Sequence, residues 1–308
     1  MSEPVAQDME TGREPLVGTN PLGRYCADPN LVVFDGRWFL YCTEDGNADW
    51  SSTSFYAYSS PDLVHWDRRK ILDLEQVPWW TGQTGGWAPS VLRRGQGDYL
   101  FYFVADRQIG VAHGSSPNGP FVSIDRPIIA EGDYDCYPID PAVFIDDDGS
   151  RYLLWGNSRA YLARLADDGM SVEESTAVSW VPGDFREAIY INKRQGRYYA
   201  SWSENDTRDP RYCVRYAVSD SLFGPWSEPR TLLEKCESLG ILATGHHSIA
   251  NIPGTDEWVI AYHRFAMNGH GDGCHRETVF APLGFRSDGS IRQVNPQPGS
   301  YWRPIGPA

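Results

Sequence analysis

The sequence of 308 residues predicts an all-β protein, because strand-like apolar runs cover the chain and helical periodicity is almost absent. From Asp28 onward these runs alternate with turns rich in Gly, Asp, Asn and Pro. The best helical candidate, residues 172–178, is too short and holds two Val and two Ser/Thr residues. A chain of this length can form one all-β domain.

A repeated unit gives the expected architecture. Each unit has a polar or aromatic leading edge, an apolar strand, a turn and an aromatic strand, and the edges recur at roughly 50 to 60 residues, a spacing typical of propeller blades. Five units predict a five-bladed β-propeller with four-stranded blades over residues 21–308, preceded by a disordered polar arm at 1–20. The leading edges are Asp28, Trp87-Ala88-Pro89, Asp140, Glu187 and His246-His247.

In chain order, every unit shows the same hairpin, in which two strand runs flank a turn. The first strand, turn and second strand of the five hairpins are 31–34, 35–36 and 38–41; 87–93, 97–98 and 99–104; 142–145, 146–149 and 152–155; 189–192, 193–196 and 197–199; and 246–252, 254–256 and 258–264. The acidic turn 146–149 lacks the terminal acid of a calcium loop, so we expect a plain turn there.

Convergence of the leading edges predicts the site. The innermost strand of each propeller blade starts near the central axis, so Asp28, Asp140 and Glu187 are expected to share one pocket, where burial and like charge raise the pKa of at least one of them. Each acid also has an ordinary interpretation, because Asp28 and Asp140 precede prolines as turn starters do and Glu187 can be a solvated strand end. Their matched positions favour the functional interpretation.

Composition restricts the partners. The formal net charge of −14 argues against nucleic acid or an anionic membrane, because those surfaces require Lys/Arg clusters. Aromatic residues make up 13% of the chain, including 12 Trp and 17 Tyr, and such rings both suit strands and stack against sugars. No run of 18 apolar residues is present to span a membrane.

The first 20 residues and the cysteines bear on localisation. Residues 1–20 lack the basic and apolar regions of a secretory signal. The six cysteines are scattered without CxxC spacing and are expected to pack as free thiols. These features predict a reduced, cytoplasmic protein, although a secreted protein whose signal had been removed has the same pattern.

The leading edges also resemble those of a known family. Ala27-Asp28-Pro29, Trp87-Ala88-Pro89-Ser90, Ile139-Asp140-Pro141-Ala142, Arg186-Glu187-Ala188 and Gly245-His246-His247-Ser248 occur in the order seen in glycoside hydrolase family 43, and 273–278 followed by 288–291 adds to the likeness. The resemblance covers about residues 20 to 300. Each motif alone is weak, and five in order at blade spacing are specific.

The resemblance implies an inverting glycosidase that acts on arabinofuranosides or xylosides. Asp28 then corresponds to the general base, Glu187 to the general acid and Asp140 to the residue that orients the acid and tunes its pKa. Trp87, Arg276 and His247 correspond to substrate-binding residues, with Arg276 bonded to sugar hydroxyls or to Asp140. His246 is expected on the axis near a bound cation, often calcium in this family; no organic cofactor is implied.

Two departures stand beside the resemblance. Many members have Gly-Pro after the catalytic glutamate, whereas Ala188-Ile189 follows here, and His247 stands where Gly is frequent, which bears on the calcium site. Trp-rich loops at 45–54 and 75–86 are expected to close the pocket, which favours exo action.

The leading hypothesis is therefore an exo-acting α-L-arabinofuranosidase with an oligosaccharide or aryl glycoside as substrate. A β-xylosidase or a β-D-galactofuranosidase can use the same acids. A retaining fructosidase is disfavoured because its Arg-Asp-Pro motif precedes the acid, whereas Arg208-Asp209-Pro210 follows Glu187. A sugar-binding propeller without catalysis is the alternative from another class, and it has no need of three acids in one pocket.

Overall fold

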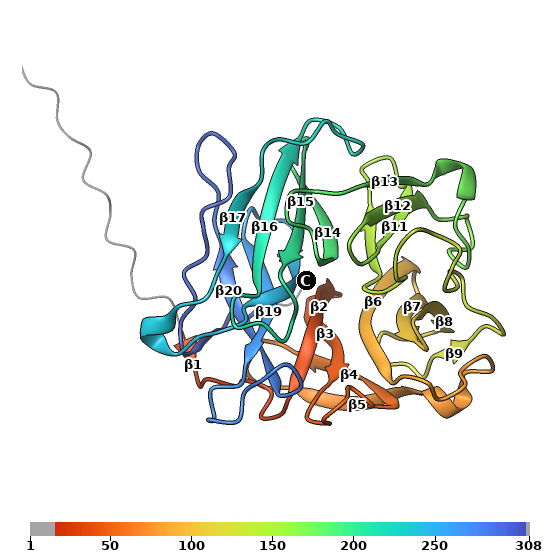
Figure 1. Ribbon diagram of the computed structural model, residues 1–308, viewed down its shortest axis with the longest axis horizontal. Coiled ribbons are helices and arrows are strands. Elements are labelled where there is room, and N and C mark those ends of the chain that lie inside the picture. Colours follow the sequence, from red (N-terminus) through yellow and green to blue (C-terminus); the bar gives the residue numbers. More distant parts are fainter. Residues whose placement is uncertain (1–15, 306–308) are drawn as a thin grey trace, which may run out of the picture.

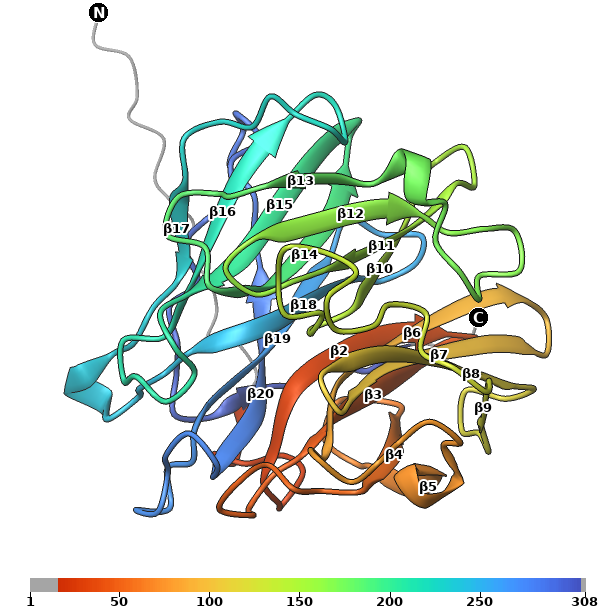
Figure 2. The same ribbon diagram turned by 45° about the vertical axis from the view of Figure 1, so that its right-hand side comes forward.

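The structure is a computed structural model that describes residues 16–305, and in it five antiparallel sheets surround a central axis (Figure 1). The predicted five-bladed β-propeller is confirmed. Within each blade the strands run in chain order from the axis outward, so that β2 and β6 border the centre of Figure 1 while β5 and β9 lie at the rim. The inner strand β18 of the last blade lies beside β2 of the first and closes the ring (Figure 2).

Four blades have four strands, and the fifth has three among the described residues. The first two blades comprise β2 (Cys26–Phe34), β3 (Arg37–Glu44), β4 (Ser54–Ser60) and β5 (Asp67–Asp73), then β6 (Gly86–Gly95), β7 (Asp98–Ala105), β8 (Gln108–Gly114) and β9 (Val122–Ser123). The others comprise β10 (Ala142–Ile145), β11 (Arg151–Trp155), β12 (Ala160–Arg164) and β13 (Val178–Trp180); β14 (Glu187–Arg194), β15 (Arg197–Glu204), β16 (Cys213–Ser219) and β17 (Arg230–Leu233); and β18 (Gly245–Asn251), β19 (Trp258–Phe265) and β20 (Arg276–Leu283).

Short strands near the two ends of the described chain meet beside the fifth blade. β1 (Leu16–Val17) pairs with β21 (Ser300–Tyr301), and the Phe280 backbone N–H of β20 donates to Ser300 Oγ at 2.9 Å. The expected disordered arm is therefore too long at its C-terminal end, since Leu16 and Val17 form a strand. Its first 15 residues lie outside the described residues.

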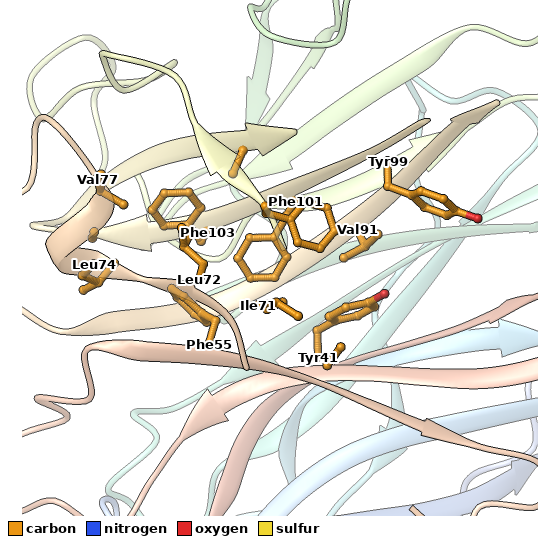
Figure 3. Close-up of a cluster of buried hydrophobic side chains, with 14 of the residues drawn as sticks. Tyr41, Phe55, Ile71, Leu72, Leu74, Val77, Val91, Tyr99, Phe101 and Phe103 are labelled. Carbon is orange, nitrogen blue, oxygen red and sulfur yellow. The ribbon is translucent and has the colours of Figure 1, made fainter. Parts of the chain in front are cut away.

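Aromatic clusters between blades hold the ring together. Between the first two blades, Phe55 of β4 lies 5.1 Å from Phe101 and 5.6 Å from Phe103 of β7, measured between ring centroids, and all three rings are buried (Figure 3). Burying such a side chain contributes about 1.5–3 kcal/mol. Comparable clusters between the other blades fix the positions of the inner strands.

Helical structure in the described residues is limited to three single 3₁₀ turns, η1 (Leu74–Gln76), η2 (Glu174–Thr176) and η3 (Glu237–Leu239). None of the described helices has the length and apolar character needed to cross a membrane. The expectation of six free thiols is wrong for one pair, because Cys26 and Cys42 on neighbouring strands β2 and β3 form a disulfide.

Candidate active site

A shared backbone distortion sets the positions of the site residues. In each blade, one residue close to the start of the inner strand has a left-handed backbone conformation. In four blades the inner strand also has one extra residue at this position, a β-bulge that shifts its register with the next strand. A positive φ is uncommon for residues other than glycine, and such strain clusters at functional sites. The five residues are Asp28 (φ 53°), Ala88 (43°), Asp140 (57°), Ala188 (57°) and His246 (37°).

The distortion refines the predicted matching of the blades. Asp28, Asp140 and His246 are equivalent, as expected, but Glu187 is one residue earlier and is equivalent to Trp87. In four of the five blades the backbone N–H of the left-handed residue donates to a side chain of the preceding blade. Ala188, for example, donates to Asp140 Oδ2 at 3.0 Å. One repeated backbone device thus presents both kinds of side chain to the axis.

These side chains face a single cavity of about 350 Å³. A larger surface groove of about 950 Å³ beside β20 has no acidic residue in its lining, so size alone does not identify the site. The cavity that does contain the acids is lined by Asp28, Trp50, Trp87, Arg107, Tyr137, Ile139, Asp140, Asn157, Ser158, Arg186, Glu187, Asp206, Thr207, Arg208, His246 and Arg276.

Asp28 is buried among positive and hydrogen-bonding partners. Its Oδ1 lies 3.0 Å from Arg276 Nη1, 3.2 Å from His246 Nδ1 and 3.1 Å from His263 Nδ1, and its Oδ2 accepts the Thr43 hydroxyl at 2.6 Å. Burial is the largest influence and raises the pKa of Asp28, but Arg276, His246 and His263 together outweigh it and hold the pKa well below its usual value. Asp28 is therefore a carboxylate at neutral pH.

Arg276 is itself held in place by Asp45, which was not among the residues predicted from the sequence. Arg276 Nε donates to Asp45 Oδ2 at 2.7 Å and Nη2 to Oδ1 at 3.1 Å, and both side chains are almost fully buried. Arg276 Nη1 also donates to Thr207 Oγ1 at 3.1 Å. Among the described residues Arg276 makes no bond to Asp140, because its guanidinium pairs with Asp28 and Asp45. The other possibility, bonds to sugar hydroxyls, stays a prediction.

Glu187 has neutral hydrogen-bond donors instead. Tyr212 OH donates to Oε1 at 2.9 Å and Asn157 Nδ2 to Oε2 at 2.9 Å, while Arg186 Nε stands 3.9 Å from Oε2. Burial raises the pKa of Glu187 to about 7; the Tyr212 hydrogen bond and Arg186 oppose this rise, and the charge of Asp28 adds to it. Glu187 therefore holds a proton over much of the range below pH 7.

Asp140 lies beside both acids and is buried. Burial, followed by the charges of Glu187 and Asp28, raises the pKa of Asp140 well above its usual value. Its Oδ2 accepts the Ala188 N–H, so it fixes the backbone next to Glu187. Asp140 was expected to tune the pKa of Glu187, but the largest cause of the raised pKa of Glu187 is its own burial.

Tryptophans form one wall of the cavity. Trp87 lines it as expected, and its Nε1 donates to the Trp50 carbonyl at 2.8 Å. Trp50 belongs to the predicted closing loop 45–54. The other predicted loop, 75–86, contributes no lining residue, because its Trp79 stacks on Phe103 in the core between blades.

The two adjacent histidines differ. His246 lines the cavity, whereas His247 does not, so the structure does not bring His247 to the place where it was expected to bind substrate. The His247 imidazole is buried with Nε2 2.7 Å from Ser201 Oγ of the neighbouring blade, and its ring lies against Tyr190. The left-handed backbone at His246 decides which of the two side chains faces the site.

The donors around His246 do not form a direct calcium site. Calcium takes about six to eight oxygen ligands, but His246 Nδ1 faces Asp28 Oδ1 at 3.2 Å and Asp140 Oδ2 only at 4.0 Å. Among the described residues, the one group of three His, Cys, Asp or Glu ligands close enough to share a metal is Cys26, Cys42 and Glu44, and its two sulfurs are joined.

Comparison with known proteins agrees with this geometry. A family model described as Glycosyl hydrolases family 43 matches residues 19–291. A β-D-galactofuranosidase from Aspergillus niger is 32% identical over 96% of this chain and 90% of its own length. A xylosidase/arabinosidase from Bacteroides ovatus is 28% identical over 87% of this chain and 94% of its own.

Solved structures give the same result. The structure of a GH43_1 enzyme from Xanthomonas citri complexed with xylose has a TM-score of 0.76 and 28% identity, covering 91% of this chain and 93% of its own. A β-xylosidase/α-arabinofuranosidase from a compost metagenome, solved with xylotriose in a calcium-free form, has a TM-score of 0.73 and 26% identity over 92% of this chain and 98% of its own.

Proposed function

The chain belongs to family 43 of the glycosyl hydrolases and is an inverting glycoside hydrolase, and we propose that it releases a terminal furanosyl residue, with an α-L-arabinofuranoside as the first candidate substrate. One observation carries the catalytic part of this proposal, the assignment of a base and an acid. Two buried carboxyl groups face one cavity, and the pKa of Asp28 is lowered while that of Glu187 is raised to about 7. Opposed pKa shifts of this kind assign a base and an acid.

In the proposed reaction, ionised Asp28 takes a proton from a water molecule, which attacks the anomeric carbon. Protonated Glu187 donates its proton to the leaving oxygen as the glycosidic bond breaks. The water must fit between the base and the sugar, so inversion requires the two carboxyl groups to stand about 6.5–9.5 Å apart. Asp140 orients the acid through the Ala188 amide, and Arg276 keeps Asp28 ionised.

A β-D-galactofuranoside is the second candidate, and the relative from Aspergillus niger supports it. α-L-Arabinofuranose and β-D-galactofuranose have the same ring configuration, and galactofuranose carries one more carbon on its side chain. Residues that bind one ring can therefore bind the other. A β-D-xyloside is the third substrate to test, because the relative from Bacteroides ovatus carries both xylosidase and arabinosidase in its name.

Exo action is proposed from the size of the cavity and from the Trp50 loop. A volume of about 350 Å³ lies at the small end of the range for ligand sites, which is about 300–1,000 Å³. The Trp50 ring, paired with Trp87, covers one side of the cavity. These features suit a terminal sugar better than the interior of a polymer.

The test is release of 4-nitrophenol from the α-L-arabinofuranoside, β-D-galactofuranoside and β-D-xyloside, by wild type beside Asp28→Ala. We expect release from at least one furanoside and loss of that release in the variant. Proton NMR of the first product gives the stereochemistry. A product that first appears with the anomeric configuration of the substrate contradicts the mechanism, and xyloside hydrolysis alone contradicts the furanosyl assignment.

A further inference from the structure

The mouth of the cavity is cationic, although the chain carries a formal net charge of −14. Arg276, on the floor, is neutralised by Asp28 and Asp45. Three further arginines, Arg107, Arg186 and Arg208, line the same cavity. A local surplus of positive charge on an otherwise acidic protein favours the binding of an anionic ligand.

Two of the three arginines share one carboxylate. Arg186 Nη2 lies 3.1 Å from Asp206 Oδ2, and Arg208 donates to both Asp206 oxygens at 2.7 and 2.8 Å. Both side chains stay partly open to solvent, with 40% of the Arg186 and 63% of the Arg208 side chain exposed. At the mouth, three guanidinium groups against the single Asp206 leave a surplus of two positive charges while Glu187 is protonated. Deeper in the site, Arg276 faces two carboxylates, Asp28 and Asp45.

Arg107 lies on a rigid support. It is the second residue of the two-residue turn between β7 and β8, where Asp106 and Arg107 have φ of 50° and 57°, as a type I′ hairpin requires. The Asp106 carboxylate fixes that turn, because it accepts the Thr81 N–H and hydroxyl and the Thr84 N–H. The Arg107 side chain is exposed.

No carboxylate of the described residues forms an ion pair with Arg107. Its guanidinium carbon instead lies 5.6 Å from the ring centroid of Tyr137, which also lines the cavity and is 52% exposed. An exposed aromatic ring next to an unneutralised guanidinium offers a sugar both a stacking face and a charge. An anionic group that lay over Tyr137 would reach Arg107.

Arg107 and Tyr137 lie on the side of the cavity that holds Glu187, the proposed acid. The backbone of Tyr137 pairs with that of Asn157, whose side chain donates to Glu187 Oε2. Arg186 precedes Glu187 and faces the same oxygen at 3.9 Å. Glu187 protonates the leaving oxygen in the proposed function, so the arginines and Tyr137 surround the space that the leaving group must occupy.

We propose that the leaving-group subsite formed by Tyr137, Arg107, Arg186 and Arg208 selects a carboxylate-bearing sugar, that is, a uronic acid unit next to the furanosyl residue that is released. This inference rests on the proposed function. A planar guanidinium matches a carboxylate through two parallel hydrogen bonds, which favours a carboxylate over a hydroxyl at this place. The sugar ring stacks on Tyr137 while its carboxylate lies toward Arg107.

The test compares two aryl furanosides of the same sugar, the 4-nitrophenyl and the 3-carboxy-4-nitrophenyl glycoside, at low ionic strength. We expect wild type to hydrolyse the carboxylated compound with kcat/KM about tenfold higher, as a charge-assisted hydrogen bond allows. The ratio of the two kcat/KM values cancels general effects on the enzyme. The ratio should fall toward one as added sodium chloride screens the charges of the arginines at the mouth of the cavity.

The variants are Arg107→Gln, which should bring the ratio close to one, and Arg107→Lys, which keeps the charge without the fork and should give an intermediate ratio. Arg126→Gln is the matched control, because Arg126 is exposed and does not line the cavity; its ratio should equal that of wild type. Thermal melting checks that each variant folds.

The outcomes separate the two proposals. A ratio near one in wild type, or a high ratio that survives in Arg107→Gln, overturns the uronate subsite and leaves the furanosidase standing. Failure of wild type to hydrolyse either glycoside with any of the candidate furanosyl groups overturns the proposed function and the subsite with it.

Discussion

Asp28 and Glu187 face the same cavity and are both shielded from water, yet their surroundings move their pKa values in opposite directions. Around Asp28, the Arg276 guanidinium and two imidazoles outweigh burial. Around Glu187, the donors in contact are the neutral Tyr212 and Asn157, and burial prevails. The contrast shows that the charge of the partners, and not the depth of the group, separates a base from an acid in this site.

The largest expected effect comes from removing the base. Asp28→Asn keeps the shape of the side chain but cannot accept the proton of water, so we expect kcat/KM to fall about 10⁴-fold, at the upper end of the range for general acid–base groups. The loss should be similar for every leaving group, because the base does not touch the leaving oxygen. Aryl glycosides of graded leaving-group acidity measure this.

The second prediction concerns the acid and sharpens the contrast. Glu187→Gln should lower kcat/KM roughly 10²- to 10³-fold for an alkyl glycoside, whose oxygen must be protonated as it leaves. For a 2,4-dinitrophenyl glycoside the loss should be small, because that phenolate leaves without a proton. Equal losses for both substrates would contradict the role of Glu187 as the acid.

The third prediction removes the cation beside Asp28, so that the surroundings of the base resemble those of the acid Glu187. Arg276 is the largest of the influences that lower the pKa of Asp28, so Arg276→Met should raise that pKa. Activity requires ionised Asp28, and its acidic limb, which lies below ordinary carboxylate pKa values in wild type, should move to higher pH. We expect kcat/KM near neutral pH to fall on the order of 10-fold or more, because the orientation of Asp28 is also lost.

The control for the Arg276→Met variant is a substitution of Asp45, which holds Arg276 in place. Asp45→Asn keeps the cation but weakens its bidentate support, so the acidic limb should stay low while kcat/KM falls by less than in Arg276→Met. Because breaking a buried ion pair leaves an uncompensated charge, both variants should melt at lower temperature. An upward move of the acidic limb in Asp45→Asn as large as in Arg276→Met would show that Arg276 does not act on Asp28 through its charge.

Much of the fold could be predicted from the sequence, because the strand and turn pattern of each hairpin lies within one short stretch of residues. The acids Asp28, Asp140 and Glu187 could be selected for the same reason, since each stands at the leading edge of a unit. The one-residue offset of Glu187 could not, because it depends on a bulge that the alternation of side chains does not reveal. The corresponding bulge on β18, between Gly245 and His247, misled the assignment of His247, since one residue of register moves a side chain to the other face.

The supporting residues Asp45 and Tyr212 could not be predicted from the sequence for a different reason. Asp45 and Arg276 are 231 residues apart, and they meet only because the ring closes. Tyr212 reaches Glu187 over Gly245, where a Cβ atom would stand 2.2 Å from the Tyr212 ring. No local pattern marks such residues, because each is an ordinary strand-end or loop residue until the blades meet.

The smallest expected effect tests the acid side with a single atom. Tyr212→Phe removes the hydroxyl that donates to Glu187 Oε1, a hydrogen bond that lowers the pKa of Glu187. Glu187 must be protonated to act, so wild-type activity should fall as pH rises through about 7. Without that bond the pKa rises further, and the alkaline limb should move to higher pH.

The cost of Tyr212→Phe at the optimum should be only a few-fold, because one hydrogen bond contributes about 0.5–1.5 kcal/mol and Asn157 still holds Oε2. The pH dependence of kcat/KM on an alkyl glycoside measures the limb, and a 2,4-dinitrophenyl glycoside serves as the internal control, since it needs no acid. If the alkaline limb moves down or stays in place, the neutral donors do not tune the acid, and burial alone must account for the difference between Glu187 and Asp28.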